Sequence, residues 1–196
     1  MNIPIIFNNA PAAPVNGYGR ITIAPGGTQD ISVIALYAVD PSLNILDPND
    51  TTTSHGPGAL LTDLDQKVNG SGVLLTQQVA TGPAQGNFAL NGHIITAANG
   101  EADFVGQAAA NAGSLSGNVD VNDFASGTGQ NPAVAFSGTL TADTAHGGRF
   151  TIPVNLKLAN NQLPLNLVFY QVSDSQFVMV EAGTGTSGTG TMQKQQ

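Results

Sequence analysis

Apolar and polar residues alternate most clearly between Phe150 and Leu158. Every even position in this segment is a large apolar residue, and the odd positions are Thr, Pro, Asn and Lys. This period of two predicts a β-strand with one buried face, because successive side chains of a strand point to opposite faces. Pro153 falls on the outward face and has no N–H to donate. We therefore expect the strand to lie at an edge or a bulge, or to leave this position unpaired.

Short apolar runs bounded by turn-forming residues predict further strands. These runs are Ile31 to Val39, Leu163 to Val172 and Phe177 to Glu181. Asn99-Gly100 predicts a two-residue hairpin turn. Leu60 to Val68 is the one window compatible with a short helix. The prediction is an all-β fold, either an antiparallel up-and-down barrel or a sandwich.

The sequence contains an internal repeat. At an offset of 129 residues, Gly19 to Ile23 aligns with Gly148 to Ile152 without a gap. The offset becomes 133 at Tyr37 and 118 from Gly70 onward. Changes of this kind indicate insertions and deletions between two copies of one structural unit.

The two copies predict two repeat units of unequal completeness. Residues 1–79 are expected to form a partial unit that lacks its first strands, 80–85 a linker, and 86–196 a complete unit. The fall in offset from 133 to 118 gives the first copy 15 extra residues, which we assign to a loop insertion over 51–65. Residues 86–131 have no counterpart in the first copy, so the sheet of the partial unit should have open edges.

Charged residues are scarce, which narrows the range of partners. The 196 residues include 5 Lys or Arg and 13 Asp or Glu, which gives 9% charged residues and a net charge of -8. Ordinary soluble domains have about a quarter charged residues. Five scattered cations cannot neutralise a run of phosphates, so nucleic acid is excluded as a main partner. No apolar run is long enough for a membrane helix, so no membrane span is predicted.

The chain has no Cys, which excludes disulfides, thiol nucleophiles and Cys-ligated zinc. Low charge, absence of Cys and abundant small polar residues together favour a bacterial protein that is extracellular or at the cell surface. The first residues show no basic segment followed by a long apolar run, so we expect no export signal within this sequence.

Six motifs of the second copy follow one another in a recognisable order. They are Gly86 to Gly92, Ala112 to Asn122, Phe136 to Leu140, Gly147 to Thr151, Val168 to Ser173 and Gly188 to Gln195. This order resembles a tandem-repeat β domain of large secreted or cell-surface proteins of Acidobacteria-like bacteria. The resemblance covers 86–196 and the later part of 1–78, and it implies a lipocalin-like barrel or a sandwich without known catalytic residues. Ile21 and Phe150 depart from the family, which often has a second Gly after the Arg.

Four oxygen-bearing side chains form a candidate calcium site. Asn118, Asp120, Asn122 and Asp123 resemble the first half of a calcium loop, because a hard cation binds several oxygens that a turn brings together. The Gly and the distal Glu of an EF-hand loop are missing, so the alternative is a turn rich in Asn and Asp. No other cofactor is predicted.

Arg20 and Arg149 occupy the same place in both copies although the chain has only five cations. Each guanidinium could tie a strand end to carbonyls or a carboxylate, or it could clamp an anionic ligand. Tyr37 and Tyr170 also recur, and each could pack with its hydroxyl bonded or stack on a ligand. These four residues are the candidate ligand-binding residues.

No catalytic residues are predicted. His55, His93 and His146 lack any metal-ligand spacing, and the chain contains no G-x-S-x-G motif. We favour a noncatalytic module with a structural, adhesive or self-assembling role, whose partners are copies of itself bound through open sheet edges. One alternative is a small-ligand barrel with an apolar cavity lined by Phe88, Phe136, Phe150 and Phe169. A hydrolase is the third possibility.

Overall fold

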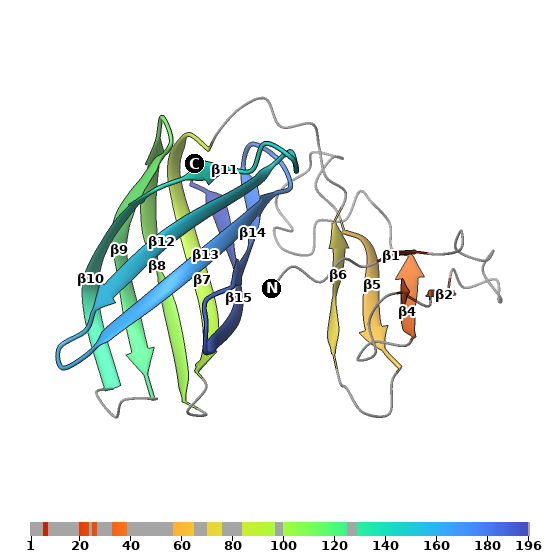
Figure 1. Cartoon of the computed structure of the whole chain (residues 1–196), viewed down its shortest axis with the longest axis horizontal. Coiled ribbons are helices and arrows are strands. Elements are labelled where there is room, and N and C mark those ends of the chain that lie inside the picture. Colours follow the sequence, from red (N-terminus) through yellow and green to blue (C-terminus); the bar gives the residue numbers. More distant parts are fainter. Residues whose placement is uncertain are drawn as a thin grey trace. The chain divides into compact units, whose positions relative to one another are not determined.

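A computed structural model describes residues 6–7, 20–23, 25–26, 33–38, 57–64, 70–75, 84–96, 100–124 and 129–195. The chain divides into two compact units, residues 1–76 and 77–196. All regular structure within the described ranges is antiparallel β-sheet, as Figure 1 shows. The predicted all-β class is confirmed.

The second unit is a curled sheet of nine strands that follow the chain as a meander (Figure 1). Its strands are β7 (Gly86–Thr96), β8 (Glu101–Asn111), β9 (Ser114–Asp123), β10 (Gly129–Thr139), β11 (Thr141–Ala142), β12 (Arg149–Lys157), β13 (Gln162–Gln171), β14 (Gln176–Glu181) and β15 (Thr186–Lys194). The order in the sheet is β10-β9-β8-β7-β15-β14-β13-β12-β11. The last long strand, β15, pairs with the first, β7, over its whole length. The topology is up-and-down, and the first and last strands of the unit, β7 and β15, are hydrogen-bonded neighbours within the sheet.

The two ends of this sheet order meet where β10 lies beside β12 (Figure 1). β11 continues β10 after one residue and pairs with β12 at two positions. A Cβ at Gly138 of β10 would lie 2.6 Å from Ile152 Cγ1 and 2.9 Å from the Pro153 carbonyl oxygen. Glycine therefore permits a close approach of the two strands along this seam.

Pro153 lies on β12, whose edge opposite β13 runs along the seam between β10 and β12. β12 pairs with β13 along its whole length, whereas its other edge pairs, among the described residues, only with the two residues of β11. The Pro153 carbonyl points toward Gly138, and the nitrogen of a strand residue points to the same side as its carbonyl. The missing N–H thus falls where no ladder bond is made. Of the three expected arrangements, an edge position is the one found: Pro153 pairs with Asn166 of β13, and no described strand pairs with it on the other side.

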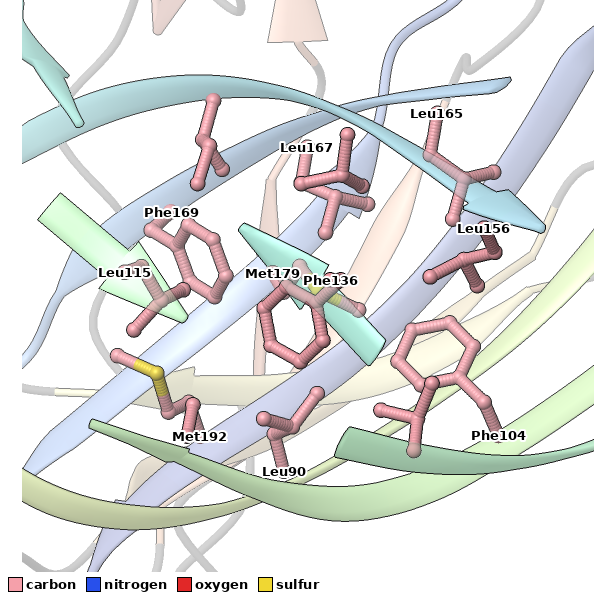
Figure 2. Packing of buried hydrophobic residues seen from close by; sticks show 14 of the residues in the cluster. Leu90, Phe104, Leu115, Phe136, Leu156, Leu165, Leu167, Phe169, Met179 and Met192 are labelled. Carbon is pink, nitrogen blue, oxygen red and sulfur yellow. The ribbon is translucent and has the colours of Figure 1, made fainter. Parts of the chain in front are cut away.

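The inner face of the curled sheet holds the hydrophobic core (Figure 2). Its side chains come from strands on all sides, and they include Phe88, Leu90, Phe104, Leu115, Phe136, Leu156, Leu165, Leu167, Phe169, Met179 and Met192. The five even-numbered apolar residues from Phe150 to Leu158 are all buried. The strand with one buried face, which the alternation predicted, is therefore confirmed as β12.

Two glycines make room for the large core side chains. A Cβ at Gly92 of β7 would overlap the ring of Phe104, and a Cβ at Gly190 of β15 would lie 2.5 Å from Met179 Cε. The two glycines belong to paired positions, Gly190↔Gly92. The core thus places the large side chains of Phe104 and Met179 against the glycines of β7 and β15.

The first unit contains a four-stranded sheet of order β2-β4-β5-β6 and a two-stranded sheet of β1 and β3. The bounds are β1 (Ile6–Phe7), β2 (Arg20–Ile23), β3 (Pro25–Gly26), β4 (Ile34–Ala38), β5 (Pro57–Asp63) and β6 (Ser71–Leu75). β3 follows β2 with one residue between them, so these two strands lie along one stretch of chain.

The four-stranded sheet has the same strand order and register as β12 to β15. Arg20 pairs with Tyr37 in the first unit, and Arg149 pairs with Tyr170 in the second. Further equivalent pairs are Tyr37↔Leu60 and Tyr170↔Val178, Leu61↔Gly72 and Met179↔Gly190, and Ala59↔Leu74 and Phe177↔Met192. The first unit therefore reproduces four strands of the curled sheet.

β1 extends this correspondence by a short strand. Phe7 of β1 aligns with Phe136 of β10 at the offset of 129, and it pairs with Pro25 of β3. β1 thus occupies in the first unit the place that β10 occupies beside β12. No strand within the described residues corresponds to β7, β8 or β9.

Three local predictions are corrected. The helical window Leu60 to Val68 is wrong over residues 60–63, which belong to β5, and residues 65–68 lie outside the described part of the chain. The loop insertion assigned to 51–65 overlaps the same strand, and the offset of 118 already holds at Ala59, so the extra residues precede Ala59. The Asn99-Gly100 hairpin joins β7 to β8, but pairing ends at Ile95↔Glu101, so its connection is longer than two residues.

The other predicted strands agree with the structure. The runs Ile31 to Val39, Leu163 to Val172 and Phe177 to Glu181 correspond to β4, β13 and β14. β13 and β14 start one residue before the predicted runs, and the described part of β4 lies within its predicted run. Alternation therefore located these strands closely.

Candidate functional site

Arg149 stands at the start of β12, directly after the turn that follows β11. Its side chain is 15% exposed, and its Nη1 donates to Asp143 Oδ2 at 2.9 Å. The guanidinium carbon lies 5.9 Å from the ring centre of Tyr170, which is its cross-strand partner. This distance permits a cation–π contact. Arg149 thus links the preceding turn to β13.

Asp143 is the acceptor at the centre of this turn. Its Oδ1 accepts from the Ala145 backbone N–H at 2.9 Å, and its Oδ2 lies 2.9 Å from His146 Nδ1. His146, the Ala145 N–H and Arg149 together lower the pKa of Asp143 below its ordinary value. The interaction with the Tyr170 side chain, and then Asp143, raise the pKa of Arg149. The Nη1 group of the guanidinium is therefore engaged by a protein carboxylate.

The equivalent position in the first unit lacks this carboxylate. Arg20 pairs with Tyr37 in the same register, but the Arg20 side chain lies outside the described part of the structure. At the offset of 129, Pro14 stands where the second copy has Asp143. Register brings each Arg beside its Tyr, and ligand binding by Arg20, Arg149, Tyr37 and Tyr170 stays a prediction.

The predicted calcium ligands lie on β9, which is an extended strand, so the alternative of an Asx-rich turn is wrong. Asn118, Asp120 and Asn122 share the outer face, whereas Asp123 is buried. The Cα atoms of alternate strand residues are about 7 Å apart. The oxygens that bind one calcium ion must each come within about 2.3–2.6 Å of the ion. Asp120 Oδ1 instead accepts from the Ala133 backbone N–H at 2.8 Å. Calcium binding by these residues stays a prediction that an extended β9 does not favour.

Asp120 supports an irregularity in β10. The register of β10 against β9 shifts between Asn131 and Val134, and Ala133 has a φ of 52°. A non-glycine residue in this region is uncommon and marks a locally strained backbone. The Asp120 bond satisfies the backbone N–H of that residue, so it has a structural role in the bulge.

The described histidines pair with single carboxylates. His93 Nδ1 lies 2.7 Å from Asp103 Oδ1 across the β7–β8 ladder, with both side chains exposed, and His146 contacts Asp143. His55 lies outside the described residues. Within the described part of the chain, no group of three or more His, Asp or Glu side chains is placed to hold a metal ion.

The small-ligand alternative requires space inside the curled sheet. The gap between the inner side chains of β7 to β10, β12 and β13 holds about 10 Å³. A single water molecule needs about 10–15 Å³ of such space. Phe136 and Phe169, which the cavity hypothesis placed on a ligand, line this gap and fill it, and Phe88 packs edge-on against Phe177 with ring centres 5.6 Å apart. This gap thus has no room for a small molecule.

Glu181 is a buried carboxylate that the sequence analysis missed. It is 3% exposed at the end of β14. Its oxygens accept from the backbone N–H groups of Asn166 and Gly183, each at 2.8 Å, and from the Thr186 hydroxyl. Three donors satisfy the charge, which fits a structural role in fixing the β14–β15 turn. The repeat offset of 118, which aligns Asp63 with Glu181, was the signal that could have found it.

The sequence analysis also missed a difference in side-chain exposure between the equivalent residues Leu74 and Met192. Leu74 of β6 and Met192 of β15 occupy the same register, opposite Ala59 and Phe177. Met192 is 1% exposed, whereas Leu74 is 51% exposed. β15 is covered by β7 on its second edge, and β6 has no second partner strand within the described residues. This edge of β6, on which no described strand pairs, is therefore the strongest candidate interaction site.

Comparison with protein-family models and with curated proteins finds no match for this chain. The resemblance to bacterial surface repeats therefore remains a prediction from its six motifs. None of the described residues belongs to a helix long and apolar enough to cross a membrane.

Proposed function

We propose that this protein is a noncatalytic β-repeat module with a structural, adhesive or self-assembling role, extracellular or at the cell surface. The first unit associates with copies of the chain through its open sheet edge. The observation that supports this most strongly is the contrast between Leu74 and Met192, which have the same register but very different exposure.

The composition of β6 adds to this support. Its residues are Ser, Gly, Val, Leu and Leu, with no charge and no proline. Proteins commonly protect edge strands with lysine, proline, bulges or covering segments, because unpaired backbone groups recruit other strands. By contrast, the two strands at the seam carry such devices: β10 has a bulge, and β12 has Pro153 and Lys157.

A noncatalytic role is favoured by the way in which the titratable side chains are engaged. His93 pairs with Asp103, and Asp143 contacts His146 and Arg149. Asp103 thus faces an imidazole, and Asp143 faces an imidazole and a guanidinium, whereas the base of a hydrolase orients a nucleophile.

Sedimentation velocity of the full chain over a range of concentrations tests the proposal. We expect reversible association that Leu74→Lys weakens by tenfold or more, because a charge at an apolar edge opposes strand pairing. Leu60→Lys is the matched control, since Leu60 is also exposed but lies on β5 with partners on both edges. A chain that stays monomeric at all concentrations would overturn the proposal.

A further inference from the structure

We propose that two copies of the chain pair their β6 strands antiparallel about a two-fold axis at Val73, which joins two four-stranded sheets into one of eight strands. The inference rests on the proposed function and names its partner segment. The following steps derive the partner and the register from the described ladders.

The second unit shows how many strands this type of sheet requires. Eight long strands, β7 to β10 and β12 to β15, enclose its core, and β12 to β15 form half of them. The first unit reproduces that half as β2, β4, β5 and β6. A second copy of the same half supplies four more strands, so two first units together have the strand number that covers an apolar face in this chain.

Two strands are candidate partners of β6: β7, and the β6 strand of a second copy. They differ in whether both of their edges are already paired. In the second unit the strand beside β15 is β7, but β7 is held by nine residue pairs with β15 and by a further ladder with β8. Moving β7 to another copy would break these pairs. The β6 strand of a second copy has no ladder on its second edge within the described residues, so its pairing breaks no described ladder.

Symmetry and length fix the register. Residues directly opposite in an antiparallel pair share a face, and a two-fold axis perpendicular to the sheet keeps the two inner faces together. The five residues Ser71 to Leu75 overlap fully only when Val73 lies opposite Val73 of the second copy. Leu74 then lies opposite Gly72, the position without a side chain, and its exposed surface becomes part of a shared apolar face.

This register can be tested by cysteine cross-linking, because the natural chain contains no Cys. Opposite residues in an antiparallel pair have Cα atoms about 4.5–5.5 Å apart, which lies within the range that a disulfide bridges. We expect the full-length Val73→Cys variant to form a disulfide-linked dimer on mild oxidation. Most of the protein should be linked at concentrations where sedimentation shows association.

Ser71→Cys is the matched control. In the proposed register Ser71 lies opposite Leu75 of the second copy, and the two Ser71 Cα atoms are about 14 Å apart. Ser71→Cys alone should therefore give little dimer. A mixture of the Ser71→Cys and Leu75→Cys variants should give the cross-linked heterodimer, which also covers the case that Val73→Cys disturbs β6.

The outcomes separate the inference from the proposed function. A protein that never associates overturns both. Association without Val73→Cys cross-linking, or equal cross-linking by Ser71→Cys, overturns the β6 pairing alone. Cross-linking between a Val73→Cys copy and an Asn91→Cys copy, in place of the Val73 homodimer, would instead show that β7 is exchanged, since Asn91 lies opposite the residue equivalent to Val73.

Discussion

The two units of this chain place the same half-sheet in different surroundings. In the second unit β7 covers the outer edge of β15, and Met192 is buried. In the first unit the equivalent β6 has no described partner on that edge, and Leu74 is half exposed. Strand order and register are therefore held by the repeat sequence itself, whereas burial depends on the strands that flank it.

The largest expected effect comes from truncating the two equivalent side chains. Met192→Ala should lower the free energy of unfolding of the second unit by about 2–5 kcal/mol, because it leaves a cavity in the core. Leu74→Ala should cost less than about 1 kcal/mol in dilute solution, since half of the side chain is already in water. Urea denaturation of both variants measures the difference.

The same pair of variants tests whether association changes the comparison. The cost of Leu74→Ala should rise with protein concentration if the β6 edge is covered in an assembly, because association stabilises the folded state by mass action. The cost of Met192→Ala should not depend on concentration. Equal costs in dilute solution would contradict the different burial of the two positions.

Gly190 and Gly72 are another equivalent pair, and their substitution by alanine should give a smaller difference in the free energy of unfolding. A Cβ at Gly190 would overlap the Asn91 carbonyl and lie 2.5 Å from Met179 Cε, so Gly190→Ala should destabilise by about 1–3 kcal/mol. A Cβ at Gly72 would lie 3.3 Å from the mobile end of Leu61, so Gly72→Ala should stay within about 0.5 kcal/mol of wild type. Thermal unfolding measures both; a larger loss from Gly72→Ala would contradict this view of β6.

Asp143 has no acidic counterpart in the first unit, and its effect should depend on pH. Its pKa is lowered in the folded chain, so the ionised carboxylate stabilises the fold above the ordinary value of about 4. This stabilisation is lost as the pH falls through the lowered folded pKa. Asp143→Asn should therefore be less stable than wild type at pH 7, and the gap should shrink below about pH 4. A gap that persists unchanged at low pH would show that the charge is not its cause.

β9 also lacks a counterpart among the described strands of the first unit. Of the changes considered, the addition of calcium should have the smallest effect. Because β9 is extended, we expect the melting temperature to be the same in a chelator and in about 5 mM calcium, which exceeds the dissociation constants of extracellular calcium modules. Asp120→Asn is the control. A calcium-dependent rise in the wild type that this variant lacks would establish a calcium site at Asp120.

The sequence predicted those parts of the fold where large apolar residues mark the inner face. β12 and β13 were found because Phe, Ile, Leu and Val occupy nearly every inner position, and β14 was found from its run of apolar residues, of which Phe177 and Met179 face the core. β8, which follows the predicted turn at Asn99-Gly100, has a weaker signal, since its inner positions include Gly106, Ala108 and Ala110, which carry little hydrophobic signal. A Cβ at Gly106 would lie 2.7 Å from Val119 Cα, so close packing requires these small residues.

The candidate sites were harder to predict, because they depend on which strands face one another. The repeat offset identified Arg149 and Tyr170, and their cross-strand contact agrees with it. Spacing alone suggested a turn at Asn118, where the chain is in fact extended. The exposure of Leu74 could not be read from sequence, because its aligned partner Met192 is buried.

The pairing of β15 with β7 has a consequence for how the second unit folds. Every other ladder of this unit joins strands that are neighbours in the chain, whereas the Thr191 hydroxyl donates to Asn91 Oδ1 across 100 residues. Contacts between distant residues carry the greatest loop-closure entropy and slow the folding rate. We expect the hairpins to form early and the β15–β7 ladder to close last. Until it closes, β15 exposes the edge that corresponds to the edge of β6 on which no described strand pairs.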